Sequence, residues 1–309
     1  MAHKSDEVRN MRQYLIKSKK LVRLIDFGHY QVFDNSTTYT IISMFDNTMC
    51  SDTFEYLSFN AERNKNSHVD NLSYNDIFIN GKFYLADKDS LNQLKEIKVK
   101  KVAKYAIVKN GFATLSDDIF IKNVPFKAFT IPIIKASTGK WHQGFFPYNN
   151  NGKPISKDVI FNDKDVADYL NNHKAQLLKG KSEEDNPYWY LYGRTQALKD
   201  VFTLKTAINT IIKDVDGIKL NQVGIGCGLY SGLYIISRLP YESIERLIKT
   251  YDFIQYLTLL KNYKSGGYYT YNSKDLEQYI NYKISKDDTA RNYLSTNEQN
   301  LFERDFKIF

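Results

Sequence analysis

Residues 186–205, with the sequence NPYWYLYGRTQALKDVFTLK, concentrate the side chains in this chain best suited to recognition chemistry. Four aromatic residues are followed by the quartet Gly-Arg-Thr-Gln at 193–196. Aromatic rings offer flat stacking faces, while arginine and glutamine offer paired hydrogen-bonding groups that match base edges. The same residues also suit a buried aromatic cluster with one paired arginine. The segment alone leaves both interpretations open.

Two patterns resemble catalytic loops but lack the flanking sequence that such loops need. Asn186-Pro187-Tyr188 looks like a broken Asn-Pro-Pro-Tyr loop of N6-adenine methyltransferases, yet it follows the polar run 179–185 in place of a buried strand. The glycine-rich run 224–228 resembles a nucleotide-binding loop, but a strand-like segment follows it where a helix is required. We interpret the first pattern as incidental and the second as a bend between strands.

Metal-binding spacings are missing from the sequence. The five histidines are scattered, and Cys50 and Cys227 form no zinc or disulfide pattern, so we expect no metal site. Asp117 and Asp118 are adjacent carboxylates, which on a polar run usually face solvent. A metal-dependent nuclease site built from this pair remains an alternative.

Basic residues favour an acidic partner. The formal net charge is +8 over 309 residues, and lysines gather beside aromatic residues at 98–105 and 135–142. Lysines would hold phosphates, while arginine and glutamine would reach base edges. We therefore predict DNA contacts from seven basic, amide and indole side chains: Lys135, Lys140, Trp141, Trp189, Arg194, Gln196 and Lys205.

Helical periodicity and strand-like runs alternate irregularly along the chain, which favours an α+β fold. Helices are expected over 5–18, 90–99, 163–180, 241–263 (as two helices meeting near 250) and 273–280. Strands are expected over 21–27, 38–45, 82–85, 106–108, 118–121, 129–134 and within 217–237. The polar segment 46–80 is predicted to be a long connection or insertion.

Membrane and export signals are not expected. No apolar run approaches the roughly 20 residues that span a bilayer, and no signal peptide is recognisable. We interpret the two cysteines as reduced thiols. These features predict a cytoplasmic protein without a membrane partner.

Several segments, in order, resemble the C-terminal part of the gamma-class, TaqI-like N6-adenine DNA methyltransferases of restriction-modification systems. They are 21–45, 110–121, 134–148 with 189–198, and 266–280. The resemblance implies three regions. Residues 1–50 would end a methyltransferase-like sheet, 51–100 would form a linker or insertion, and 101–309 would be a DNA target-recognition domain of short strands and helices.

The resemblance also implies a role for Phe33. In this family the target adenine is flipped out of the duplex, and an aromatic residue between two late strands packs against it. Phe33 occupies the matching position in QVFDNS. A core phenylalanine closing a hairpin is an equally good interpretation of the residue itself.

The S-adenosylmethionine loop and the Asn-Pro-Pro-Tyr loop of the family would lie upstream of Met1. The resemblance thus implies that this chain holds no cofactor, that S-adenosylmethionine serves the complete enzyme, and that the chain alone is inactive. Its implied partners are double-stranded DNA and a methyltransferase catalytic domain or subunit. The alternatives are a metal-dependent restriction nuclease and a protein-interaction subunit of such a system.

Overall fold

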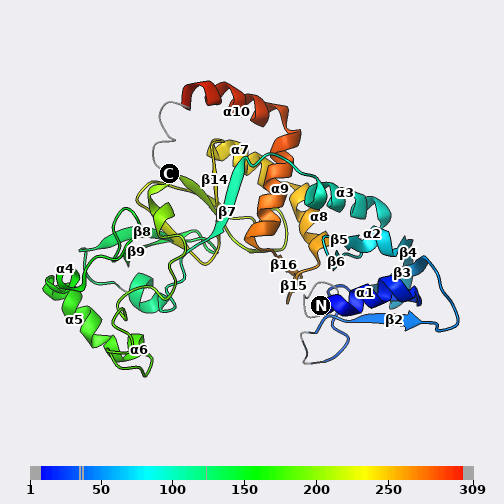
Figure 1. Cartoon of the computed structure of the whole chain (residues 1–309), viewed down its shortest axis with the longest axis horizontal. Coiled ribbons are helices and arrows are strands. Elements are labelled where there is room, and N and C mark those ends of the chain that lie inside the picture. The colour runs from blue at the N-terminus through cyan, green and yellow to red at the C-terminus, as the bar shows by residue number, and fades with distance from the viewer. Residues whose placement is uncertain (1–7, 35, 37, 123, 302–309) are drawn as a thin grey trace.

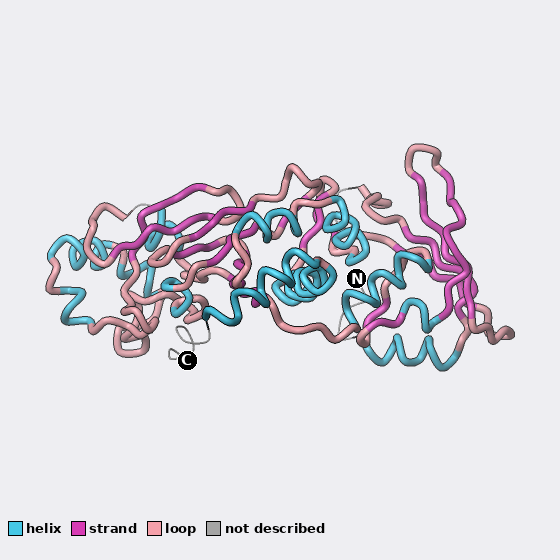
Figure 2. The backbone as a smooth tube through the Cα atoms, turned by 90° about the horizontal axis from the view of Figure 1, so that it is seen from above, coloured by secondary structure: helices cyan, strands magenta, loops and turns pink. Residues whose placement is uncertain are grey.

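The computed structural model describes residues 8–34, 36, 38–122 and 124–301. Figure 1 shows an arch with two arms, one carrying the N-terminal sheet and the other carrying the segments between residues 111 and 200. Figure 2 shows small groups of strands spread along the long axis, with helices between them, in place of one continuous sheet. This arrangement confirms the predicted α+β class.

The N-terminal arm is built on a mixed four-stranded sheet. Its strands lie in the order β2-β1-β3-β4, with β1 antiparallel to β2 and parallel to β3. The bounds are α1 (Arg9–Ser18), β1 (Leu21–Asp26), β2 (Ile41–Phe45), β3 (Thr53–Asn60) and β4 (Lys65–Ser73). The predicted helix followed by two strands on one sheet is confirmed, although residues 5–7 lie outside the described chain.

The segment 46–80, predicted to be a long connection or insertion, is not a connection, because it supplies β3 and β4 to the same sheet. In β3, Phe54 and Tyr56 are buried while their neighbours are at least partly exposed, which is the two-residue period of a strand. The run then continues as α2 (Tyr74–Ile77), β5 (Phe78–Ile79), β6 (Lys82–Phe83) and α3 (Lys88–Val99). The domain boundaries at 50 and 100 stay a prediction.

The centre of the arch holds an antiparallel sheet in the order β12-β10-β14-β7. Its strands are β7 (Ala106–Asn110), β10 (Lys205–Ile208), β12 (Leu220–Val223) and β14 (Leu233–Ser237). Beside it lie α7 (Tyr241–Ile248), α8 (Tyr251–Leu260), α9 (Ser273–Lys286) and α10 (Asp288–Leu301), with the short strands β11 (Ile211–Ile212), β15 (Tyr263–Lys264) and β16 (Tyr268–Thr270). The predicted pair of helices meeting near residue 250 is confirmed.

The second arm contains a three-stranded sheet in the order β13-β8-β9 and several short helices. The bounds are η2 (Asp118–Lys122), β8 (Thr130–Lys135), β9 (Lys140–Phe145), α4 (Lys157–Phe161), α5 (Lys164–Asn172), α6 (Lys174–Leu178), η3 (Lys199–Phe202) and β13 (Gly228–Tyr230). The strand predicted over 118–121 is wrong, since these residues form one π-helical turn. The helix predicted over 163–180 is divided into α5 and α6.

The buried apolar side chains form two large clusters, which divide between the arms of the arch. One extends from the N-terminal sheet through α3 and α8 to α9 and the central sheet. The other fills the second arm and includes Phe120, Phe145 and Tyr192. The N-terminal arm and the centre therefore share one core, while the second arm has its own.

Helix α9 closes the free edge of β7 with polar side chains. The Asn281 amide oxygen accepts hydrogen bonds from the backbone N–H groups of Tyr105 (2.7 Å) and Ala106 (2.8 Å), and its nitrogen donates to the Ala106 carbonyl. Glu277 accepts from the N–H of Val108 at 2.9 Å. Because an edge strand exposes unpaired backbone groups, this helix replaces the strand that would otherwise pair there.

We predict that Asn281→Ala lowers the free energy of unfolding by about 2–4 kcal/mol, because several buried backbone groups lose their partner at once. Chemical denaturation measures this change. The exposed Lys274 on the same helix gives a control, and Lys274→Ala is expected to change stability by less than about 0.5 kcal/mol. Equal effects of the two substitutions would contradict the role of Asn281.

Candidate nucleic-acid interface

The Gly-Arg-Thr-Gln quartet lies beside the loop that follows β7. The N–H of Gly193 donates to the Thr114 carbonyl at 2.9 Å, and the Gln196 side-chain nitrogen donates to the Gly111 carbonyl at 2.6 Å. Arg194 between them is exposed, and none of the described residues forms a hydrogen bond or ion pair with its guanidinium. A solvent-facing arginine held on an anchored segment is available to bind an anion.

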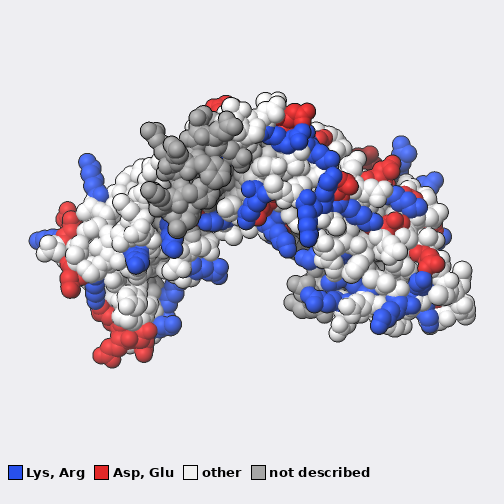
Figure 3. All heavy atoms as spheres, turned by 45° about the horizontal axis from the view of Figure 1, so that its top comes forward, with Lys and Arg blue, Asp and Glu red and all other residues white. Residues whose placement is uncertain are grey.

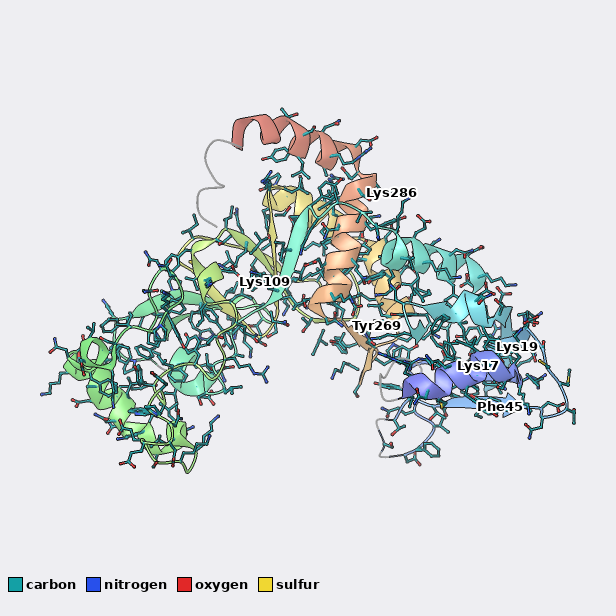
Figure 4. The ribbon with its side chains drawn as sticks, viewed as in Figure 1. Lys17, Lys19, Phe45, Lys109, Tyr269 and Lys286 are labelled. Carbon is teal, nitrogen blue, oxygen red and sulfur yellow. The ribbon has the colours of Figure 1, made fainter. Side chains whose placement is uncertain are left out.

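A groove of about 520 Å³ extends from this segment to the centre of the arch. It is lined by β7, by residues 195–200 and by Ser273 at the start of α9. Lys109 projects from β7 in the middle of the molecule, as Figure 4 shows, and its ammonium pairs with Asp200 at 2.8 Å. The Tyr234 hydroxyl donates to the same carboxylate at 2.5 Å, which fixes the position of this ion pair.

The β8–β9 hairpin brings Lys135 and Lys140 together. They lie directly opposite each other in the antiparallel register, next to the turn at Gly139. Like charges opposite each other destabilise a strand pair, and no described acidic side chain pairs with either lysine. Trp141 is 47% exposed, but the alternation of side chains places it on the other face of the hairpin from the two lysines. The structure therefore groups Lys135 with Lys140 and separates Trp141 from them.

Trp189 does not reach the surface. It is only 3% exposed, and its indole N–H donates to Glu183 at 3.2 Å. Tyr190 and Tyr192 are buried with it, whereas Tyr188 is exposed. The prediction that Trp189 contacts DNA is wrong, because the indole belongs to the core of the second arm.

Lys205 is also buried, in a strand whose four residues are all buried. Its ammonium donates to the backbone carbonyls of Asp200, Thr203 and Cys227 at 2.6–3.0 Å, and to that of Val201 at 3.4 Å. Burial lowers the pKa of Lys205 to about 8, and the nearby Asp200 acts in the opposite direction. The predicted DNA contact by Lys205 is therefore wrong, and the side chain joins η3 to the glycine-rich bend.

Gln196 is engaged in part, since its nitrogen is occupied by Gly111. Phe33 lies in the loop between β1 and β2 and is 57% exposed, so the ring is not a core residue closing that hairpin. Its role in stacking against a flipped base stays a prediction.

The adjacent carboxylates at 117–118 and the glycine-rich run have structural contacts. The Thr114 hydroxyl donates to Asp117, and Asp118 pairs with Lys122 at 2.7 Å. Among the described residues, no group of three or more histidine, cysteine, aspartate and glutamate side chains is arranged to hold a metal ion. Residues 224–227 lie between β12 and β13, and Gly228 begins β13, which confirms the predicted bend. None of the described helices combines the length and apolar character needed to cross a bilayer.

Sequence reasoning missed the surface that joins these basic groups. An open groove of about 970 Å³ is lined by Thr195, Gly193 and Leu115 and continues to Lys179 and Lys181. Thr195 also lines the groove beside Lys109, so the two grooves are neighbours. Figure 3 shows Lys and Arg side chains along the inner edge of the arch. The isolated lysines gave no sequence signal, because their proximity depends on tertiary structure.

The comparisons with known proteins give a structural likeness. No protein-family model matches the sequence, and no curated protein matches it. A solved structure of the Type IIL restriction-modification enzyme MmeI in complex with DNA is similar, with a TM-score of 0.54 and 10% identity. The match covers 87% of this chain and 36% of that one, so the chain spans about a third of MmeI.

A second match is the Type IIG restriction endonuclease BpuSI, at 10% identity over 89% of this chain and 38% of that one. Its TM-score of 0.35 is too low to support an argument. At this identity, the MmeI match shows a shared fold alone. The α+β fold described above is therefore shared with part of the MmeI structure.

Acid should weaken the hydrogen bond from the Trp189 indole to Glu183. Hydrogen bonds from Lys157, Lys174 and Trp189 lower the pKa of Glu183 from 4.5 to about 2. Because the folded-state pKa is the lower one, the stability from this carboxylate is present above pH 4.5 and is lost as pH falls towards 2.

We predict that Trp141→Phe, which leaves Trp189 as the sole tryptophan, shows buried-type fluorescence that shifts to the red between pH 4.5 and 2. In the double variant that also carries Glu183→Gln, the Trp189 emission should no longer change with pH between 4.5 and 2. Unchanged emission across the window in the parent variant would contradict the contact between Glu183 and Trp189.

Proposed function

We propose that this chain binds duplex DNA as the target-recognition part of a restriction-modification protein. The observation that carries the proposal is a set of exposed basic side chains at two neighbouring grooves, on a fold shared with part of MmeI. Lys109 lines one groove, Lys179 and Lys181 line the other, and Arg194 is exposed between the lining residues Gly193 and Thr195. The MmeI structure was solved with DNA, which supports a DNA partner for the same fold here.

The charges on this surface suit phosphates and bases in different ways. The lysines are point charges on flexible stems, so they would hold phosphates and set the position of the duplex. Arg194 offers five donors in a planar fork and has no described protein partner, so it is the side chain best suited to a guanine edge or a phosphate. Lys135 and Lys140 would lose their mutual repulsion when a phosphate lies between them.

We further propose adenine-N6 methylation as the chemistry of the complete protein, from the sequence resemblance. Phe33, exposed between β1 and β2, would then stack against the flipped adenine. The described residues do not fit S-adenosylmethionine. The glycine-rich run joins two strands and is followed by no helix, so it lacks the helix N-terminus that such loops use. Methyl transfer would require a separate catalytic domain or subunit.

The surface proposed for that catalytic partner is the free edge of β2. This strand lies at the end of its sheet, contains no charged residue, and exposes Ile42, Met44 and Phe45. Natural edge strands usually carry charges or are covered. Figure 4 shows Phe45 on this arm near Lys17 and Lys19, away from Lys109. A catalytic domain could pair with β2 while the basic surface binds DNA.

We predict that Arg194→Ala weakens binding of a short fluorescent duplex by about 1–3 kcal/mol and reduces the salt slope of log Kd by about 1, with no change in melting temperature. Fluorescence anisotropy between about 50 and 200 mM salt measures both quantities.

Arg63, exposed in the turn between β3 and β4, gives a matched control. Arg63→Ala should leave the affinity and slope unchanged. A stability loss in Arg194→Ala, or equal DNA affinities of the two variants, would show that Arg194 is not a DNA contact.

A further inference from the structure

Leu115 is a large apolar residue held at the surface in an unfavourable backbone conformation. Its side chain is 55% exposed, and its φ angle is +62°. The left-handed region is costly for residues with a branched side chain, whereas glycine and asparagine adopt it readily. A leucine at such a position is therefore neither the residue that the backbone favours nor one that the core requires.

The surrounding contacts fix this conformation. Thr114 is buried, its hydroxyl donates to Asp117, and it accepts from the N–H of Ser116 at 3.1 Å. The Thr114 carbonyl accepts from Gly193, and the Leu115 carbonyl accepts from the Lys179 ammonium at 3.3 Å. The turn is thus held on both sides by elements of the basic surface.

Gly193 explains where the leucine side chain lies. A Cβ atom on Gly193 would come within 2.4 Å of the Leu115 Cδ1 atom, so the leucine covers this glycine directly beside Arg194. The absence of a side chain at 193 leaves room for Leu115, and more than half of the leucine still faces solvent.

Leu115 also forms a ridge between two open grooves. It lines the groove of about 970 Å³ that contains Lys179 and Lys181, and also a second groove of about 640 Å³. The second groove includes Ser231, whose hydroxyl lies 3.0 Å from that of Ser137 in the turn of the β8–β9 hairpin. Lys181 lines the first groove, and Lys122, paired with Asp118, lines the second. Lys179 lines both, so lysine side chains lie in each of the grooves that Leu115 borders.

We propose that Leu115 is an apolar wedge that enters a groove of the bound duplex and partly unstacks one base step. The proposal rests on the DNA-binding function proposed above and specifies how that surface engages the bases. Proteins that deform DNA use leucine and similar side chains in this way, flanked by cations that hold the phosphates on either side. The strained turn presents the wedge before binding, so little order has to be gained when DNA arrives.

The test compares Leu115→Gly and Leu115→Asn with the intact chain. Both replacements suit a left-handed backbone, so we expect a melting temperature equal to or above that of the unchanged protein. Duplex affinity should fall about tenfold, and protein-induced permanganate reactivity of thymines, which reports unstacking, should disappear. The probe is a pool of fluorescent duplexes with a randomised centre. Val159→Ala on α4, where the valine is 53% exposed, is the control expected to change neither DNA property.

The possible results distinguish a wedge role of Leu115 from DNA binding by the chain as a whole. Loss of both affinity and permanganate reactivity in the stable Leu115 variants supports the wedge. Unchanged affinity, or weaker binding with no change in reactivity, overturns it while DNA binding by the intact chain stands. Failure of the intact chain to bind the pool at low salt contradicts the proposed function itself. A lowered melting temperature in both variants would make Leu115 a structural residue and would also overturn the proposal.

Discussion

The hydrogen bonds between α9 and the edge of β7 hold the central sheet against the helices that it shares with the N-terminal arm. Asn281 pairs with three backbone groups of β7 and the residue before it, and Glu277 pairs with a fourth. At its other end, α9 is joined to the N-terminal arm, because buried Lys98 of α3 pairs with Asp275 at 3.0 Å. Removing Asp275 would leave the buried Lys98 charge without a partner, and removing Asn281 would leave backbone groups of β7 unpaired. One helix thus connects the central sheet, from which Lys109 projects, with the arm that carries β2.

In the second arm, some residues of the types that bind DNA are buried, and others are exposed. Trp189 and Lys205 stabilise the interior, the first through Glu183 and the second through four carbonyl groups. Arg194, between them in sequence, faces solvent. The buried members hold the neighbouring segments in place, so the exposed arginine sits on a supported surface. Rigid support of this kind lowers the ordering cost when a ligand binds.

Local patterns predicted the longer helices before residue 286 and about half of the strands, because capping residues and apolar periodicity act over a few positions. The pair α7 and α8 and the bend at 224–228 are examples. The same patterns missed α10, β9 and β10. The pairing of β3 with β1 was missed because polar residues hid the alternation of Phe54 and Tyr56. The site was predicted less well. Whether a lysine such as Lys205 or Lys135 is buried depends on distant carbonyls and strands, and the exposure of Leu115 depends on Gly193 far along the chain.

Duplex DNA is proposed to bind the surface formed by the loop after β7, the β8–β9 turn and the segment 193–199. Hydrogen–deuterium exchange with and without a short duplex at low salt tests this proposal most directly. The predicted result is slower exchange in residues 111–117, 136–140 and 193–199, with unchanged exchange in β2. Exchange that is unaltered in all three segments, or protection confined to β2, would contradict it.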